Sequence, residues 1–300
     1  MDEHDGPELL ARRFEAERRR LVAVAYRMLG SAAEAEDAVQ EAWLRLATVD
    51  AGSIGNLAAW LTTVVSRLCL DALRGRAARR EDPVGEHVPD LALDGDGPEQ
   101  EAELAESVGR ALLVVLDALG PDERVAFVLH DSFAVPFDRI APIVGRSPGA
   151  AKKLASRARA KVHGTPAAGA EKVAGHRVVV EAFLAAARGG DIAELLAVLA
   201  PDVVRRADPA ALPAGRAVLV RGARAVADET LVLGRRARYA APALIDGAVG
   251  IVVAPRGRLT LALTVTITGA RISSYDVIAS PPRLHALRVT LLPDPPPPRA

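Results

Sequence analysis

The chain has 300 residues, a formal net charge of zero and one cysteine, Cys69. This length suits two or three domains, and a single cysteine excludes a disulfide within the chain and any metal site with several cysteine ligands. The chain starts with an acidic and then a basic stretch, which is not a secretory signal, and no apolar run is long enough to span a bilayer. We therefore expect a cytoplasmic protein.

Charge is strongly partitioned along the chain although the total is zero. Residues 81–106 contain ten acidic residues and no Lys or Arg, whereas residues 139–170 contain seven basic residues and no acidic one. The acidic stretch also contains prolines and glycines, which favour a linker over a packed element. The sequence thus predicts an acidic linker, residues 81–106, between two basic modules.

Three helices are predicted before this linker. The first spans about Pro7–Leu29, with apolar residues at helical spacing. The second begins after Ser31, which can cap it, and Glu34 follows three residues later. The third spans about Leu57–Arg80 and has one apolar face and basic last turns. Together they predict an all-α bundle over residues 7–80.

Further helices are predicted after the linker, within a domain of residues 107–165. One spans about Glu99–Leu119, and "GPDER" opens another with Pro121 in its first turn. A helix, a tight turn at Gly145 and a second helix follow, which is typical of a helix-turn-helix. Pro142 lies inside the first helix of this pair, so we expect that helix to be short or bent.

The second helix of the pair has two different faces. One stripe is apolar and predicts burial: Ala151, Leu154, Ala155, Ala158 and Val162. The other side carries small residues, which allow close approach to a major groove, and cations, which neutralise phosphates. The alternative is a solvated charged face. The predicted DNA contacts of this helix are Arg146, Ser147, Gly149, Lys152, Lys153, Ser156 and Arg157.

The pattern changes after residue 165. An amphipathic helix is predicted over Val173–Arg188, and a second one over residues 189–204 with Asp191 as its cap. Residues 257–279 alternate apolar and polar positions as strands do, and "PRGR" and "TGAR" are predicted hairpin turns. We expect an α+β domain with a curved antiparallel sheet over residues 172–290, followed by a Pro-rich tail, residues 291–300.

Catalytic candidates in this domain are weak. His176 and His285 are far apart in the sequence and have no adjacent carboxylate motif, and Asp202, Tyr239 and Asp276 are no better supported. The chain has neither a glycine-rich phosphate loop nor the spacing of a metal site. We expect no catalytic residue, no metal and no cofactor, while the domain can enclose either a ligand pocket or a packed core.

Several stretches resemble extracytoplasmic-function sigma factors. "EDAVQEAWLRL" and "NLAAWLTTVVSRLCLDALRGRAARRE" resemble region 2 of this family, and "LGPDERVAFVLHDSF" and "IAPIVGRSPGAAKKLASRARAKV" resemble region 4, its helix-turn-helix. The α+β domain resembles the cone-shaped SnoaL fold, which one subgroup of these sigma factors carries at the C-terminus. The fold class implied is multidomain, with two all-α sigma domains and a C-terminal α+β SnoaL-like cone.

The resemblance implies roles for matched residues. RNA polymerase core would be bound by Asp37, Gln40, Glu41 and Trp43. The promoter element near the start site would be contacted by the loop of about residues 50–56 and the helix after it, through Asn56, Trp60, Ser66, Arg67, Asp71 and Arg74. The helix after Ser147 would read the upstream element. Trp60 can instead belong to the core, and Asp71 can pair locally with Arg67 or Arg74.

The function implied is that of an alternative sigma factor, which directs RNA polymerase core to promoters and helps to open them, and which is not an enzyme. The C-terminal domain would regulate in cis by contact with the sigma domains. Two signatures of the subgroup are replaced here by "PVGEHVPDLAL" and "RRADPAALPAGRAV". Two alternatives are a stand-alone helix-turn-helix regulator with a ligand-sensing domain, and a SnoaL-type enzyme fused to DNA-binding helices.

Overall fold

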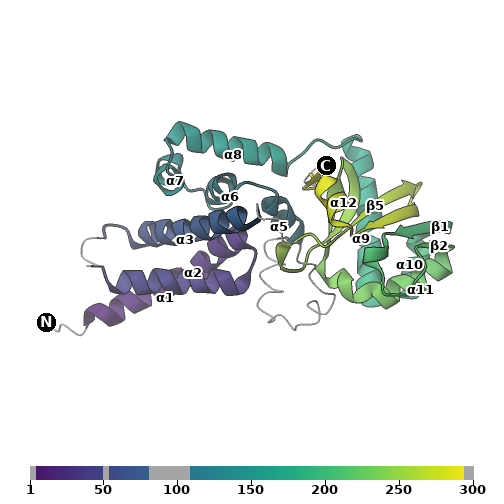
Figure 1. Cartoon of the computed structure of the whole chain (residues 1–300), viewed down its shortest axis with the longest axis horizontal. Coiled ribbons are helices and arrows are strands. Elements are labelled where there is room, and N and C mark those ends of the chain that lie inside the picture. The colour runs from purple at the N-terminus through teal and green to yellow at the C-terminus, as the bar shows by residue number, and fades with distance from the viewer. Residues whose placement is uncertain (1–4, 50–53, 81–108, 294–300) are drawn as a thin grey trace, which may run out of the picture. The chain divides into compact units, whose positions relative to one another are not determined.

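The structure is a computed structural model and describes residues 5–49, 54–80 and 109–293 (Figure 1). Four predicted features lie wholly or partly outside the described residues: the acidic linker, the start of the helix predicted from Glu99, residues 50–53 of the promoter loop, and residues 294–300 of the tail. The chain divides into two compact units. The first contains the described residues before 108 together with Leu116–Ala160, and the second contains Gly109–Val115 and the chain from Lys161 onward.

The first unit begins with the predicted three-helix bundle. The helices are α1 (Asp5–Leu29), α2 (Ala32–Ala47) and α3 (Leu57–Arg80), and each packs against the other two (Figure 1). Ser31 caps α2 as predicted, because its Oγ accepts the N–H of Glu34 at 3.4 Å. The bundle therefore forms where the apolar spacing placed it.

The predicted helix-turn-helix completes the first unit. Its elements are α5 (Arg110–Asp117), α6 (Pro121–Phe127), the π-helical turn η3 (Val128–Ser132), α7 (Phe137–Val144) and α8 (Pro148–Val162). The first residues of α5 belong to the second unit. Gly145 ends α7 with a φ of 66°, which glycine adopts without strain. With Pro142 inside it, α7 has only 8 residues, as expected.

Helix α8 divides into a buried and an exposed side as the sequence predicts. The apolar stripe Ala151, Leu154, Ala155, Ala158 and Val162 is buried. Ser147 caps the helix, since its Oγ accepts the N–H of Ala150 at 3.3 Å. The bundle and the helix-turn-helix share one unit because α3 packs against both α6 and α7.

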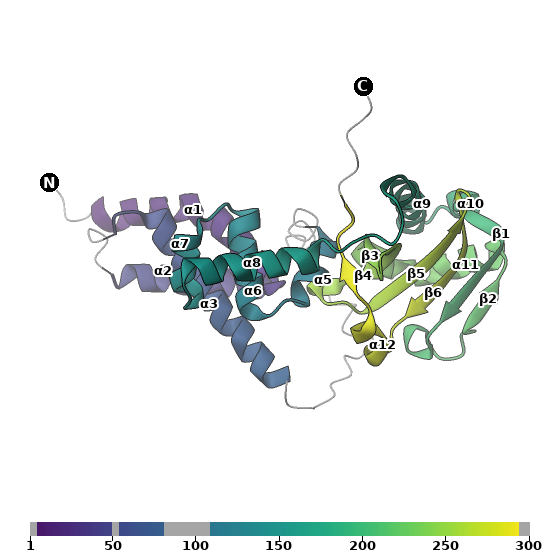
Figure 2. The same ribbon diagram turned by 90° about the horizontal axis from the view of Figure 1, so that it is seen from above.

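The second unit is the predicted α+β domain. Its helices are α9 (Ala170–Gly189), α10 (Ile192–Val198), α11 (Ala223–Leu233) and α12 (Pro281–Ala286). Its strands are β1 (Leu199–Ala207), β2 (Leu219–Arg221), β3 (Ala240–Ile245), β4 (Ala248–Val253), β5 (Leu261–Thr268), β6 (Arg271–Ile278) and β7 (Val289–Thr290). They form one sheet in the order β2-β1-β6-β5-β4-β3-β7, in which β2, β1, β6 and β5 lie side by side in Figure 2.

Two expectations for this domain were wrong in detail. The second predicted helix ends at Val198, capped by Asp191, and the residues from Leu199 to Val204 belong to β1 instead. The sheet is not purely antiparallel, because β1 pairs with β6 in parallel. The β-branched Val203 and Val204 favour a strand over a helix, and this added strand pairs with β6, far along the chain. The hairpin at "TGAR" is confirmed, with Gly269 at a φ of 62°.

The sheet has apolar residues on both faces. Helices α9, α10 and α11 cover one face, where Phe183 and Leu195 pack with Ile251 and Tyr275. A second, smaller cluster contains strand residues such as Ala243 and Val252, with Leu284 and Leu287 packed against it. Val114 of α5 belongs to this second cluster. The first turns of α5 are therefore part of the core of the second unit.

The last residues of α8 and the segment after them belong to the second unit, where they pack closely against the end of β7. The N–H of Leu291 donates to the carbonyl of Val162 at 2.8 Å. A side chain at Gly164 would place its Cβ 2.6 Å from Thr290, whose exposed fraction is 4%. Because Thr290 is buried and cannot swing away, residue 164 must be glycine in this conformation.

The ionised side chain of Asp208, in the loop after β1, should contribute to stability in a pH-dependent way. Burial would raise the pKa of Asp208, but the N–H groups of Ser280 and Ala279, each 3.1 Å from Oδ2, and the Arg283 guanidinium lower it below its ordinary value. We expect Asp208→Asn to lower the free energy of unfolding by about 1–3 kcal/mol at pH 7. A carboxylate with a depressed pKa stabilises above its unfolded pKa, so the difference should shrink from about pH 5 downward.

Urea unfolding of the full chain between pH 7 and about pH 3 measures this effect, with the exposed Asp202→Asn as the matched control. The control should unfold like the wild type at every pH. An Asp208→Asn deficit that stays constant as the pH falls would contradict the assigned role of the ionised carboxylate.

Candidate nucleic-acid interface

The outer side of α8 is the most basic surface among the predicted contacts. All seven residues predicted there are exposed: Arg146, Ser147, Gly149, Lys152, Lys153, Ser156 and Arg157. The small residues Gly149 and Ser156 leave the backbone open to close approach. The side opposite the buried stripe can therefore enter a groove without clashes from large side chains.

The cations of this side differ in what they contact. Arg157 pairs with Glu123 at 3.4 Å and Arg146 pairs with Asp122 at 3.8 Å. Within the part of the chain that the structure describes, Lys152 and Lys153 are in no ion pair. These two lysines are thus the cations of α8 most directly available to phosphates.

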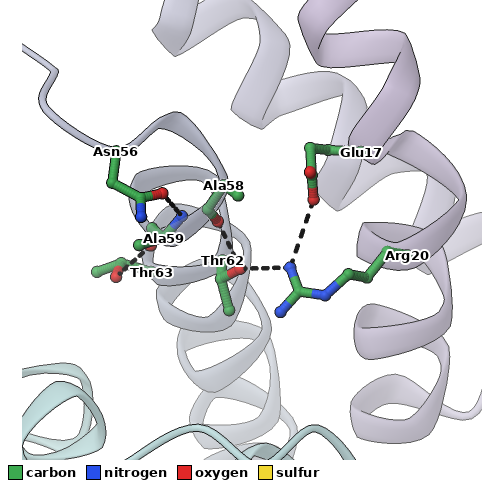
Figure 3. A network of polar contacts seen from close by, with 7 residues as sticks. All are labelled: Glu17, Arg20, Asn56, Ala58, Ala59, Thr62 and Thr63. Carbon is green, nitrogen blue, oxygen red and sulfur yellow. Dashed lines mark hydrogen bonds and ion pairs between the residues drawn. The ribbon is translucent and has the colours of Figure 1, made fainter.

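The predicted promoter residues of α3 lie in three different environments. Asn56 caps the helix, since its Oδ1 accepts the N–H of Ala59 at 3.0 Å (Figure 3). Trp60 is half-buried, so it is neither a full core residue nor an open one. Arg67, Asp71 and Arg74 are exposed. Arg74 pairs with Asp122 at 2.8 Å rather than with Asp71, which corrects the expected local pairing.

Ser66 does not fit the predicted role. Its exposed fraction is 0%, and its Oγ has no hydrogen-bond partner. Ser66 lies one position from the exposed Arg67, and a step of one residue turns a side chain about 100° around the helix, here into the bundle. We therefore withdraw Ser66 from the predicted promoter contacts.

A network of polar contacts fixes the start of α3 against α1. Arg20 donates to Thr62 Oγ1 at 3.0 Å and pairs with Glu17 at 3.5 Å, while Thr62 donates to the carbonyl of Ala58 (Figure 3). Thr62 is 6% exposed, so its hydroxyl needs these partners. The network sets the orientation of the first turns of α3, which carry Asn56 and Trp60.

The predicted polymerase contacts lie on α2 beside a hollow of about 520 Å³. Asp37 and Gln40 are exposed, and Glu41 and Trp43 are half-buried. The hollow lies between α1 and α2 and is lined by Ala11, Phe14, Glu15, Arg18, Glu36, Val39, Gln40 and Trp43. A lining that combines charged side chains with Trp43 suits contact with a partner protein.

The contribution of α1 to this hollow was missed from the sequence. The Phe14 and Trp43 rings contact each other with centroids 4.9 Å apart, and Arg18 pairs with Glu36 at 3.0 Å. Phe14 belongs to the apolar spacing that predicts α1, but this spacing does not show which helix α1 contacts. Two of the predicted contacts, Gln40 and Trp43, line the hollow, and Asp37 and Glu41 do not.

The second unit does not assemble the weak catalytic candidates. No hydrogen bond or ion pair of the described residues joins any two of His176, His285, Asp202, Tyr239 and Asp276. The described residues also contain no group of His, Cys, Asp and Glu that could bind a metal ion. Burial raises the pKa of the Cys69 thiol to about 12, so this cysteine is no nucleophile.

The second unit contains buried polar residues that sequence reasoning did not single out. Arg205 pairs with Glu229, and the Tyr275 hydroxyl lies 3.3 Å from Thr230 Oγ1. Arg205 and Tyr275 are 2% and 6% exposed. Each of these polar groups has a partner within the group, which is a packed polar core rather than an open ligand site.

Comparison with known proteins identifies both helical modules. Residues 13–79 match the family model of sigma-70 region 2, and residues 109–162 match that of sigma-70 region 4. None of the described helices is long and apolar enough to cross a membrane.

Curated relatives extend the similarity over the whole chain. The chain is 35% identical to the probable ECF RNA polymerase sigma factor SigI of Mycobacterium tuberculosis over 298 residues, which are 97% of this chain and 99% of SigI. It is 47% identical to SigJ of the same organism over 199 residues, 65% of this chain and 64% of SigJ. The crystal structure of SigJ aligns with a TM-score of 0.44 at 34% identity, covering 92% of this chain and 98% of SigJ.

The two sigma regions occur in the expected order, on the two helical modules of the fold. The alignment with SigI covers 97% of the chain and therefore includes most of the α+β domain. The chain belongs to the ECF RNA polymerase sigma factors, which direct RNA polymerase to promoters and are not enzymes.

Proposed function

We propose that this sigma factor reads the upstream promoter element with the exposed side of α8. The observation that carries the proposal is the division of α8: its apolar stripe is buried, and every predicted contact on the other side is exposed. Lys152 and Lys153 would neutralise phosphates and release counterions, which makes binding salt-dependent. Gly149 and Ser156 would let the helix backbone approach the bases.

The start-site element would be held by α3 and the loop before it. Asn56, Trp60, Arg67, Asp71 and Arg74 remain the proposed contacts. An arginine-lined helix beside a half-buried tryptophan suits single-stranded DNA, because cations follow the phosphates and an aromatic ring stacks on an unpaired base. Binding the separated strand would offset the unstacking free energy, about a few kcal/mol per step.

RNA polymerase core would bind the outer side of α2 through Asp37, Gln40, Glu41 and Trp43. The hollow between α1 and α2 supports this, because Gln40 and the half-buried Trp43 line it together with charged side chains of both helices. Phe14 would position Trp43 through their ring contact. Since core polymerase acts in the cytoplasm, we place the protein there.

The C-terminal domain would act as a SnoaL-like regulator in cis. We keep the division into residues 7–80, 107–165 and 172–290, and two contacts cross it. Val114, within the region 4 match, packs in the second apolar cluster of the sheet, and Leu291 donates to the carbonyl of Val162 at the end of α8. Both contacts lie within the second unit, which includes the first and the last residues of the region 4 match.

Run-off transcription with purified core polymerase on genomic templates tests the proposal. We expect defined start sites with the wild type, and a loss of at least about tenfold for Lys152→Glu/Lys153→Glu because both phosphate contacts are reversed. The exposed Lys172→Glu on α9 is the control for a reversed lysine and should change output less than about twofold.

Two results would overturn the proposed function. If the wild type initiates transcription at no site, the assignment of promoter and polymerase contacts to these surfaces is wrong. Tight, sequence-specific binding of duplex DNA without polymerase would instead favour a stand-alone regulator.

A further inference from the structure

Two neighbouring threonines near the start of α3 bond in different ways. Thr62 and Thr63 each donate to the carbonyl four residues earlier, at 2.7 Å to Ala58 and at 2.9 Å to Ala59 (Figure 3). The Thr62 hydroxyl also accepts Nη1 of Arg20 from α1 at 3.0 Å, whereas no other described group bonds the Thr63 hydroxyl. Of the two threonines, Thr62 alone links α3 to α1.

Arg20 is held in place for this contact by a residue of its own helix. Its guanidinium pairs with Glu17, one turn earlier on α1, at 3.5 Å (Figure 3). Thr62 is 6% exposed, so water competes little for its hydroxyl, while the Arg20 side chain remains 41% exposed. A hydrogen bond from a charged donor is stronger than a neutral one, and it has a preferred direction.

The remaining contacts between α1 and α3 define the start of α3 less closely. Both helices contribute fully buried apolar side chains to the bundle, such as Leu21 and Leu61. Apolar burial is non-directional, so it constrains the rotation of a helix about its axis less than a directional bond does. Arg76 donates to the carbonyl of Leu29 at 3.2 Å, but it lies about four turns further along α3. The bond from Arg20 to Thr62 thus fixes the end of α3 at which the helix begins.

We propose that Arg20 and Thr62 are positioning residues for promoter opening. Their hydrogen bond sets the rotation of the first turns of α3 and thereby the direction of the Asn56 and Trp60 side chains. A site that captures an unpaired base must hold its contacts to within about 0.5 Å, so this rotation decides how well the base is held. Neither Arg20 nor Thr62 touches DNA in this role. The inference rests on the proposed function, which assigns the start of α3 to the separated strand.

Thr62 distinguishes positioning from a direct effect of charge. Arg20 is cationic and partly exposed, so its removal would weaken the attraction of DNA even without a positioning role. Thr62 is uncharged and buried, so its hydroxyl neither attracts nor contacts a phosphate. A defect that is shared by changes at both residues therefore comes from the bond between them.

The test removes the hydroxyl of either threonine in the full chain. Thr62→Val and its matched control Thr63→Val both keep the branched side-chain shape and lose the bond to the preceding turn, but only Thr62→Val loses the bond to Arg20. Arg20→Gln is matched with Arg19→Gln, which removes an exposed charge that is in no described ion pair. Each variant is assayed with core polymerase at a start site that the wild type uses. The template is either fully duplex or mismatched over the start-site element.

On the duplex template we expect Thr62→Val and Arg20→Gln to lower the output about five- to tenfold, and both controls to stay within about twofold of the wild type. On the mismatched template the defects should shrink to less than about twofold, because the strands are already separated and no unstacking has to be offset. The combined Arg20→Gln/Thr62→Val should be no worse than the more defective single variant, since both changes remove one bond. A general loss of stability would instead lower the output on both templates alike.

Amide hydrogen exchange in the free chain follows the same bond without DNA. The N–H of Trp60 donates to the carbonyl of Asn56 at 3.0 Å, and the N–H of Ala59 donates to the Asn56 side chain. Both amides should exchange about five- to tenfold faster in Thr62→Val than in Thr63→Val. The amides around Arg76, at the far end of α3, should exchange equally in the two variants.

Equal output of Thr62→Val and Thr63→Val on the duplex template, or a Thr62→Val defect of the same size on the mismatched template, would overturn the positioning role. Equal exchange of the Trp60 amide in these two variants would do the same. The proposed function is judged separately, by the start sites of the wild type and by Lys152→Glu/Lys153→Glu. Defined start sites with equal threonine variants would leave the proposed function in place and remove only this inference.

Discussion

Replacing Ala158 by aspartate should destabilise the first unit by about 3–5 kcal/mol, because it buries a charge without a partner. Ala158 is 0% exposed on the apolar stripe of α8, among residues such as Ala151 and Ala155 that are also buried. No described basic side chain is buried in this stripe to offset the carboxylate. With native stability of about 5–15 kcal/mol, the change should leave the helix-turn-helix unfolded in much of the population.

The matched control is two residues away. Ala160 is exposed on the proposed groove side of the same helix, so Ala160→Asp introduces the same charge without burial. Urea unfolding followed by circular dichroism should give a free energy of unfolding within about 0.5 kcal/mol of the wild type. Promoter-directed transcription should nevertheless fall, because the new carboxylate repels phosphates. Equal stability of the two variants would show that the assigned faces of α8 are wrong.

Glu229→Ala should destabilise the second unit by about 3–5 kcal/mol, because it leaves Arg205 buried without its anionic partner. The side chains of Arg205 and Glu229 are 3% and 18% exposed. Among the described residues, the Arg205 guanidinium otherwise donates only to the carbonyl of Ala217, at 2.9 Å. Burial already lowers the pKa of Arg205, although a guanidinium stays charged in proteins. Calorimetry of the full chain should show the loss in the transition of the α+β domain.

Replacing both partners by apolar residues shows whether the loss in Glu229→Ala comes from the unpaired Arg205 charge. Arg205→Met/Glu229→Leu removes both charges together and should recover most of the stability lost in Glu229→Ala. The exposed Glu194→Ala on α10 should have little effect. If the double variant is as unstable as Glu229→Ala, the loss comes from packing and not from an unpaired cation.

The elements that the sequence predicted well are those whose faces are set by local residues. Helix α8 has a serine cap, a first-turn proline and an apolar stripe at helical spacing, and each of these signals acts within a few residues. The α10–β1 boundary was missed because Leu195–Ala200 is a continuous apolar run that spans it, and periodicity cannot divide such a run. The parallel β1–β6 pair depends on contacts about 70 residues apart, and no local pattern contains them.

The candidate interfaces show the same limit. Exposure of Lys153 and Arg157 follows from one helix and its stripe, so the sequence sufficed. Burial of Ser66 and the pairing of Arg74 with Asp122 depend on which helices pack on α3, and the chain separates those partners by 48 residues. The role of Phe14 beside Trp43 needed the crossing of α1 and α2, which sequence spacing does not reveal.

The tight junction at Gly164 has a consequence for how such a protein can be rebuilt. A domain joined through a flexible linker could be exchanged freely. Here a methyl group at position 164 would overlap the buried Thr290. A chimera that transplants another α+β domain after α8 must therefore import its final strand and the glycine together.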